Sequence, residues 1–252
     1  MAIVIKNKDD IAKIKQAVAI WKLARKAVRE ATKAGVSLNE LDLVAKNTIE
    51  SNGGICTFLG AYGFPKHICI SVNDCVIHGV PNDYVLKDGD KVTFDMGVTY
   101  EDHVCDAAFT VIIGENEEAQ KISDVCRGSL LEVVKILKPG VSNLQIANFM
   151  QTYIESRGYK VLRDFTGHGC GNSMHEDPAF PNYVDYRFPI VKLRENMVIC
   201  IEPMILTDSN KYYIDENNGW DVKAVNHKLT CHWEDMILIT SNGCEVLTSE
   251  DE

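Results

Sequence analysis

The sequence lacks the closely paired cysteines of CxxC motifs. Its nine cysteines are an odd number, and no two of them are separated by two residues. Most stand inside apolar runs, as Cys69, Cys126 and Cys200 do. This pattern is typical of reduced thiols in the core of a cytosolic protein, and it argues against a disulfide framework.

Long apolar runs and an excess of positive charge are also missing. No stretch approaches eighteen apolar residues and the start, MAIVIKNKDD, soon becomes charged, so we expect a cytoplasmic protein without a membrane span or a secretory signal. The formal net charge of -10 provides no global field that would attract nucleic acid. A short basic stripe fits the solvated face of one helix better than an RNA or membrane docking patch; it comprises Lys22, Arg25, Lys26, Arg29 and Lys33.

The chain does contain enough apolar material for a large core. Of its 252 residues, 46% are hydrophobic, which excludes disorder and fits one large domain or two tightly packed halves. Helical spacing alternates with β-branched runs, which predicts an α+β fold. Gly35 ends the first predicted helix, and Ser37 with Glu40 forms a capping box for the second. The predicted helices cover residues 9–34, 37–51, 117–137 and 142–157; the first predicted strands cover residues 67–76, 91–100 and 106–113, and strands dominate the remainder.

Two stretches of the chain repeat. GVSLNELDLVAKNTIESNG, from Gly35, aligns without a gap with GVSNLQIANFMQTYIESRG, from Gly140. LKDGDKVTFDMG likewise aligns with LRENMVICIEPM and places Asp95 opposite Glu202. Two such copies are expected to pair across a pseudo-twofold axis; the alternative is chance similarity between two amphipathic helices with matching caps. The repeat predicts a single domain of residues 1–252 with halves of roughly 9–113 and 115–240.

Four acids stand inside apolar, strand-forming runs, in VTFDMGV, CDAAFTV, ICIEPMI and HWEDMILI. Burying an unpaired carboxylate costs several kcal/mol, which a cation, a hydrogen-bond network or a metal must offset. These motifs contain no lysine or arginine, so we expect a pair of divalent metal ions to supply the charge. The four acids are Asp95, Asp106, Glu202 and Glu234.

The stretch TGHGCGNSMHEDP, residues 166–178, adds two histidines and three glycines. Alternate glycines suit a backbone that bends closely around a ligand, although a mobile surface loop is the alternative. Carboxylates with one imidazole favour Fe(II), Mn(II), Co(II) or Zn(II), which leaves the cysteines without a role as ligands. Because two cations lower the pKa of a shared water, hydrolysis of an amide is the expected chemistry.

Taken together, these motifs resemble the type I methionine aminopeptidases. The similarity spans nearly the whole chain, and the order and spacing of the motifs agree. It implies the pita-bread fold, in which two related α+β halves enclose a dinuclear metal centre, and removal of the initiator methionine from new polypeptides with a small second residue. The motifs are HGVP at His78, FDMG at Asp95, CDAAFT at Asp106, GHGCG at His168, MHEDP at His175, IEPM at Glu202 and WED at Glu234.

The resemblance also implies the metal ligands. Asp95 would chelate one ion, Asp106 and Glu234 would bridge both ions, and His168 with Glu202 would complete the other. The ions could be Co, Fe, Mn, Zn or Ni, with Fe or Mn expected in the cell because availability decides between them.

Three residues are implied in catalysis. Glu202 would also act as the proton shuttle for the attacking water. His175 would donate a hydrogen bond to the scissile carbonyl, and His78 would lie near the substrate's amide and help to transfer a proton. The remaining histidines match no ligand position and are expected to be surface or structural residues; they are His67, His103, His227 and His232.

The pocket for the methionine side chain is implied by FLGAYGFPKHICIS and a later tryptophan. Apolar, polarizable walls suit a thioether, although ordinary core packing is the alternative for Phe58 and Cys69. The chain departs from the commoner family pattern at Phe58, Phe64 and Met174, and nothing in the sequence explains Cys105, where glycine is usual. The predicted pocket residues are Phe58, Tyr62, Phe64, Cys69 and Trp220.

The expected partners are nascent polypeptide N-termini, with transient ribosome contact, and the expected state is a monomer. A proline-specific peptidase of the same fold is one alternative, although such relatives usually carry an additional N-terminal domain and this chain begins at the first helix of the catalytic fold. Type II methionine enzymes usually have a helical insertion, for which residues 202–234 leave little room. The third alternative, a catalytically silent binding module, conflicts with five intact ligands.

Overall fold

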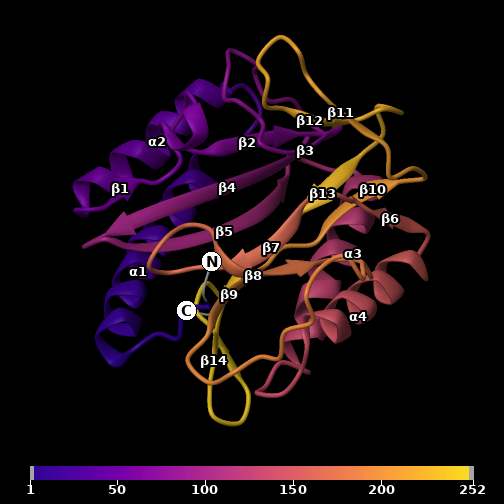
Figure 1. Ribbon diagram of the computed structural model, residues 1–252. Helices are drawn as coiled ribbons and strands as arrows, with labels where there is room; N and C mark the ends of the chain where they lie inside the picture. The colour runs from indigo at the N-terminus through magenta and orange to yellow at the C-terminus, as the bar shows by residue number, and fades with distance from the viewer. Residues whose placement is uncertain (1–2, 250–252) are drawn as a thin grey trace.

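The structure is a computed structural model that describes residues 3–249. Within that range α1 and α2 lie on one side of the molecule, α3 and α4 lie on the other, and antiparallel sheets stand between them (Figure 1). The mixed architecture agrees with the predicted α+β class. The helices are α1 Lys8–Ala31, α2 Leu38–Ser51, α3 Glu117–Val134 and α4 Asn143–Glu155.

Side-chain caps fix where the helices begin. At α2 the Ser37 side chain accepts from the Glu40 N–H, and Glu40 accepts from the Ser37 N–H at 2.8 Å, so the predicted capping box is confirmed. Helix α2 ends at Ser51 as predicted, whereas α1, α3 and α4 end two or three residues earlier than predicted. Helix α1 stops at Ala31 because Thr32 is extended and its hydroxyl donates to the Val28 carbonyl at 2.6 Å, which ends the helix before Gly35.

The longest strand pairing is the hairpin of β4, Lys91–Tyr100, with β5, His103–Ile112. The bounds of β4 agree with the prediction. Strand β5 begins before residue 106, where it is predicted to start, because Glu101 and Asp102 both have positive φ and form a two-residue turn. Helix α1 packs on both strands. The hairpin therefore has one face on the core and the other free for the site.

The single strand predicted over residues 67–76 is two strands, β2, Cys69–Val72, and β3, Cys75–Ile77. Asn73, at φ 50°, turns the chain between them. Strand β2 pairs with β4, next to β1, Ile55–Cys56, whereas β3 pairs with β12 in a different sheet. This turn sends the residues after β3 toward the later part of the chain.

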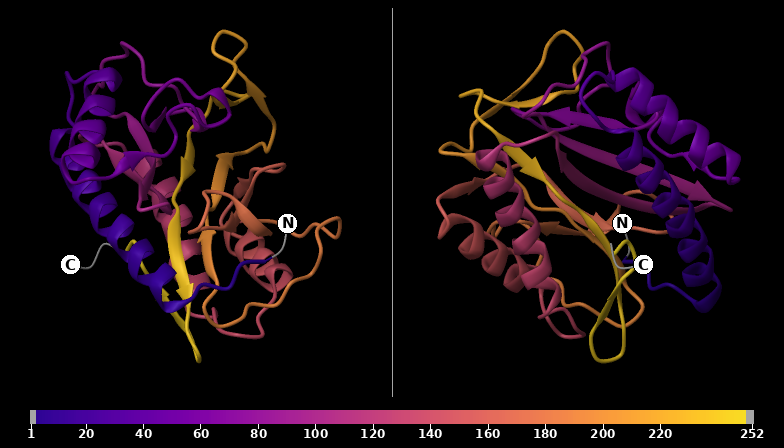
Figure 2. Two further views of the ribbon diagram at one scale, coloured as in Figure 1. Left: turned by 60° about the vertical axis from the view of Figure 1, so that its left-hand side comes forward. Right: turned by 180° about the vertical axis from the view of Figure 1, so that it is seen from behind.

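The later strands form three further antiparallel groups, in the orders β15-β14-β9-β7-β8, β13-β10-β6 and β11-β12-β3. Helices α3 and α4 pack on their outer side (Figure 2). The strands are β6 Tyr159–Val161, β7 Thr166–Gly169, β8 Glu176–Pro181, β9 Val198–Ile201, β10 Met204–Thr207, β11 Tyr212–Ile214, β12 Val222–Ala224, β13 Thr230–His232, β14 Asp235–Ile239 and β15 Cys244–Val246.

Two of the four acids predicted to lie in strands stand at strand ends instead. Asp95 is inside β4 and Asp106 is inside β5. Glu202 follows β9, where Pro203 provides no N–H to continue the ladder, and Glu234 lies between β13 and β14.

Candidate metal centre and active site

The register of the β4–β5 hairpin places two aspartates side by side. Asp106 is paired with Gly97, and Asp95 stands two residues from Gly97 on β4. Side chains two residues apart on a strand point to the same face, so both carboxylates leave the same side of the sheet.

The later strands bring a histidine and two glutamates to that face. His168 is paired with Cys200, two residues before Glu202, so these side chains also share a face. The backbone N–H of Glu234 donates to the Ala108 carbonyl at 3.0 Å, which joins the two sheets directly beside the aspartates. Elements from both parts of the chain therefore build one cluster.

The distances within the cluster suit shared cations. His168 Nε2 lies 3.5 Å from Glu202 Oε1 and 4.0 Å from Asp106 Oδ2. Ligand atoms of Asp95, Asp106 and Glu234 lie within 4.8 Å of one another, as do those of His168, Glu202 and Glu234. Glu234 belongs to both triads, which is the arrangement that a bridging carboxylate requires.

Several of these carboxylate oxygens have no hydrogen-bond partner. Asp95 Oδ1, Asp106 Oδ1 and Glu234 Oε1 are buried and unpartnered within residues 3–249. Lys91, at the start of β4, is also buried, but its Nζ donates to the carbonyls of Ser71 and Cys75 at 3.2 and 3.1 Å. Lys91 therefore does not pair with the cluster, and the buried oxygen donors fit divalent metal ions.

Burial changes the protonation of these acids strongly. It raises the pKa of Asp95 to about 7. Burial, followed by the negative charge of neighbouring carboxylates, raises the pKa values of Asp106, Glu202 and Glu234 well above their usual range. Four such acids do not all ionise in one cavity unless positive charge is present.

His168 is oriented for ligation. Its Nδ1 lies 2.9 Å from the Gly169 carbonyl, which only accepts, so Nδ1 carries the hydrogen and Nε2 presents a lone pair to the carboxylates. Burial, with a smaller effect of His175, lowers the pKa of His168 to about 3. Cys200 is nearby, but burial raises the pKa of its thiol well above the usual value.

His175 and His78 flank the cluster. The His175 ring lies edge-on to His168, with 4.4 Å between centroids, and its Nδ1 is 3.2 Å from the hydroxyl of Tyr62. His78 has a φ of 59°, an uncommon backbone conformation for a non-glycine residue. Burial lowers the pKa of His78 to about 4 and also lowers that of His175. Both rings are therefore neutral near pH 7.

An apolar cavity of about 140 Å³ opens beside the carboxylates. Phe58, Phe64 and Cys69 form its buried wall, and Met174 and Trp220 pack against them. Of the predicted pocket residues, Tyr62 alone is widely exposed, at 79%, so it stands at the rim and stacks on His175. The cavity also touches all five predicted metal ligands: Asp95, Asp106, His168, Glu202 and Glu234.

A second cavity of about 280 Å³ adjoins two of these acids, Asp95 and Glu202, and is also lined by His78, Phe165 and His232. Of the two environments expected for His232, surface or structural, the structure excludes the surface: the residue is buried, with Nε2 at 3.8 Å from Glu202 Oε2. The sequence signal that could have identified it is strand alternation, because His232 stands two residues before Glu234. The other three histidines pair with aspartates elsewhere: His67 with Asp42, His103 with Asp10 and His227 with Asp74.

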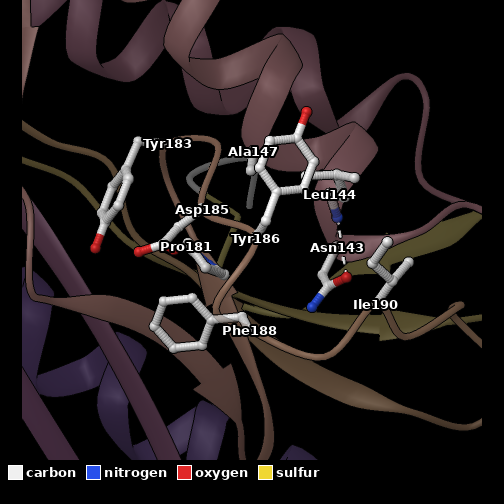
Figure 3. Close-up of a pocket in the computed structure, with 9 residues that line it drawn as sticks. All are labelled: Asn143, Leu144, Ala147, Pro181, Tyr183, Asp185, Tyr186, Phe188 and Ile190. Carbon is white, nitrogen blue, oxygen red and sulfur yellow. Dashed lines mark hydrogen bonds between the residues drawn. The ribbon is translucent and has the colours of Figure 1, made fainter.

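A separate hollow lies between α4 and the segment that follows β8 (Figure 3). Tyr186 and Phe188 stand over it, and Asn143 closes its base with a side-chain bond to the Val191 N–H. Its volume of about 10 Å³ holds no more than a water molecule. The hollow therefore offers no competing site.

The sequence resembles those of known proteins. The model of a family described as Metallopeptidase family M24 matches residues 12–241. The curated methionine aminopeptidase of Mycoplasma capricolum subsp. capricolum is 41% identical over 251 residues, which are 99% of this chain and 99% of that protein.

Solved structures of a methionine aminopeptidase and of a prolidase both superpose on this chain. The crystal structure of methionine aminopeptidase from Thermotoga maritima superposes with a TM-score of 0.94 at 35% identity, covering 99% of this chain and 100% of that one. Prolidase from Pyrococcus furiosus superposes with a TM-score of 0.79 at 25% identity, covering 99% of this chain and 66% of that one. This chain is more similar to the aminopeptidase than to the prolidase, in both sequence identity and TM-score.

Proposed function

The chain belongs to metallopeptidase family M24, and from that premise we propose how its site works. The protein is a metal-dependent methionine aminopeptidase with the pita-bread fold, since methionine aminopeptidases match it over essentially their full length. The observation that best supports a site for this function is the buried cluster around Glu234. This residue belongs to two groups of three side chains whose ligand atoms lie close together. The alternative activity, cleavage at proline, is less well supported by the comparisons.

The cluster is proposed to hold two divalent ions. Asp95 would chelate one ion, Asp106 and Glu234 would bridge the pair, and His168 with Glu202 would complete the second. When bound, such ions acidify water and polarise a carbonyl group. The three unpartnered carboxylate oxygens support this assignment. Oxygen and nitrogen donors admit Co, Fe, Mn, Zn or Ni, and we propose Fe or Mn in the cell.

The chain's own residues then move protons and orient the substrate. Glu202, which belongs to the cluster, accepts the proton of the attacking water and delivers it to the leaving amine. His175 donates a hydrogen bond to the scissile carbonyl oxygen as negative charge develops there. His78, which lines both cavities, lies by the amide nitrogen. Their neutral rings each offer one N–H without adding charge.

The apolar cavity is proposed to select methionine. Phe58, Phe64 and Cys69 provide a dry wall, and Trp220 packs edge-on against Phe64 with 5.1 Å between ring centroids. Aromatic rings and sulfur suit a flexible thioether. We propose that a small second residue follows methionine into the adjoining cavity, where 5.6 Å separates the ring centroids of His78 and Phe165.

The substrates are proposed to be the N-termini of nascent polypeptides, met by a monomer in transient contact with the ribosome. No helix within residues 3–249 is long and apolar enough to span a membrane. We propose the cytoplasm as the place of action, where new chains carry their initiator methionine.

The test is methionine release from the peptide Met-Ala-Ser by protein that has been stripped of metal and reloaded with Fe(II), Mn(II) or Co(II). We expect release from Met-Ala-Ser, little from Met-Leu-Ser and none from a Gly-Pro dipeptide. Absence of release with every metal would contradict the function. Cleavage of the Gly-Pro dipeptide alone would support the proline-specific alternative instead.

A further inference from the structure

His232 is a buried imidazole whose ring nitrogens have no partner. It ends β13 and is 1% exposed, and neither Nδ1 nor Nε2 forms a hydrogen bond within residues 3–249. The other buried, unpartnered side-chain polar atoms in that range are oxygens of Asp95, Asp106 and Glu234, which are proposed metal ligands. His232 therefore shares this condition with the metal cluster and with no ordinary core residue.

The ring is aimed at one particular carboxylate. His232 Nε2 lies 3.8 Å from Glu202 Oε2, while His168 Nε2 lies 3.5 Å from Glu202 Oε1. Two imidazoles thus face the two oxygens of one acid. The backbone of Glu202 is fixed, because its carbonyl accepts from Asn182 Nδ2 at 2.8 Å, but its carboxylate makes no hydrogen bond in the described chain. The ring of His232 is therefore placed to hold the carboxylate oxygen that is not the one next to His168.

We propose that His232 is a positioning residue for Glu202. Its Nε2–H donates to Oε2, which leaves Oε1 directed toward His168 and the metal. This inference rests on the proposed role of Glu202. A separation of 3.8 Å is longer than a hydrogen bond, and such contacts often tighten only when the site is loaded. A partner that fixes the orientation of a ligating group is a common requirement of metal sites.

A purely structural role fits His232 poorly. Histidines with such a role in this chain have a close acidic partner, as His103 does, with Asp10 at 3.1 Å. His232 instead lines the 280 Å³ cavity next to His78 and Glu202. Its carbonyl, which accepts from the Thr110 hydroxyl at 2.8 Å, already fixes the backbone without any need for the ring.

The test replaces the ring with side chains that keep or remove a donor at one position. In His232→Gln the amide nitrogen reaches the place of Nε2, in His232→Asn it reaches the place of Nδ1, and His232→Leu provides neither. We measure kcat and KM on Met-Ala-Ser, and the affinity of the metal-free protein for Mn(II) by calorimetry.

We expect His232→Leu to lower kcat about 10- to 100-fold and to weaken Mn(II) binding by a similar factor, as is usual when the partner of a metal ligand is lost. KM should change by less than about twofold, because the ring does not bind the methionine side chain. His232→Gln should stay close to the unmodified protein in both measurements, and His232→Asn should behave like the Leu variant.

Unaltered kcat and Mn(II) affinity in His232→Leu would overturn the proposal, as would rescue by Asn and not by Gln. Loss of a whole Mn(II) equivalent in both the Leu and the Gln variant would make the ring a metal ligand and also overturn it. If the Leu variant does not fold, the Gln and Asn variants decide. The matched control is His103→Leu, which should leave kcat unchanged. Failure of the proposed function can be told apart from failure of this proposal, because in that case the unmodified protein itself would release no methionine.

Discussion

Glu234 connects the two sheets through its backbone and the two triads of ligand atoms through its side chain. Its N–H and carbonyl pair with Ala108, which stands two residues after Asp106 on β5. This short link explains why carboxylates from distant parts of the chain stand within 4.8 Å of one another. Substitution of either bridging acid should therefore disturb both halves of the site at once.

We expect Asp106→Asn and Glu234→Gln each to lower metal-dependent turnover by at least about a hundredfold. Each change removes the negative charge of a proposed bridging carboxylate, and the charge stabilisation supplied by bound metal is worth several kcal/mol in the transition state. The measurements are kcat/KM on Met-Ala-Ser and bound metal per chain by elemental analysis. The control is Glu245→Gln, an exposed acid that pairs with Lys15. Full activity in either bridging variant would contradict the ligand assignment.

The four acids that gather in the cluster could be singled out from the sequence residue by residue, whereas only a weak signal marks His232. Asp95 and Asp106 are conspicuous because a carboxylate in an apolar strand needs an explanation. In TCHWED the histidine is the last residue of a strand of only three residues, so its alternation with Glu234 is too short to stand out. Its aim at Glu202 depends on a third segment of the chain, which no local pattern contains.

At the scale of elements, the starts of helices were more predictable than most of their ends. Capping boxes are local, so Ser37 and Ser142 mark the starts of α2 and α4 in the sequence itself. The split of β2 from β3 depends on a positive φ at Asn73, and the break after Glu202 depends on Pro203. The proline was a visible signal for a break, whereas asparagine permits this backbone conformation without requiring it.

The segment before α1 is fastened to the loop that carries His175. Lys6 Nζ lies 2.5 Å from Glu176 Oε2, with side chains 0% and 6% exposed. The other carboxylate oxygen of Glu176 accepts the backbone N–H groups of Asn172 and Ser173 at 2.7 and 3.0 Å. One buried acid thus connects the N-terminal segment to the whole turn between β7 and β8.

We expect Lys6→Met to destabilise the protein by about 3–5 kcal/mol, because it leaves Glu176 buried without its cation. Turnover should fall as well, since the turn that holds His175 loses its fixed shape. Urea unfolding and kcat on Met-Ala-Ser measure the two effects. The matched control is Lys15→Met, which breaks an exposed pair with Glu245 and should cost less than about 1 kcal/mol. Equal destabilisation by both variants would show that burial of the Lys6 pair is unimportant.

At the scale of the whole molecule, the site is complete only when the two parts of the chain pack together. Asp95 and Asp106 come from the first hairpin, and His168, Glu202 and Glu234 come from the later strands. The sequence repeat indicates two related halves, and we propose that they correspond to residues 9–113 and 115–240. The pairing of β3 with β12 joins residues far apart in the chain, and no local spacing predicts its register.

This architecture makes metal binding part of the stability of the fold. Without metal, four acids are buried together with their pKa values raised, and ions that bind only the folded chain stabilise it by mass action. At a free metal concentration about 100 times Kd the gain is about 2.7 kcal/mol, which corresponds to a rise in Tm of roughly 5–10 °C for a chain of this length. Thermal unfolding of chelator-treated protein with and without added Mn(II) measures this rise. Asp106→Asn should show little or none of it, and an equal rise in that variant would place the stabilising ion outside the proposed cluster.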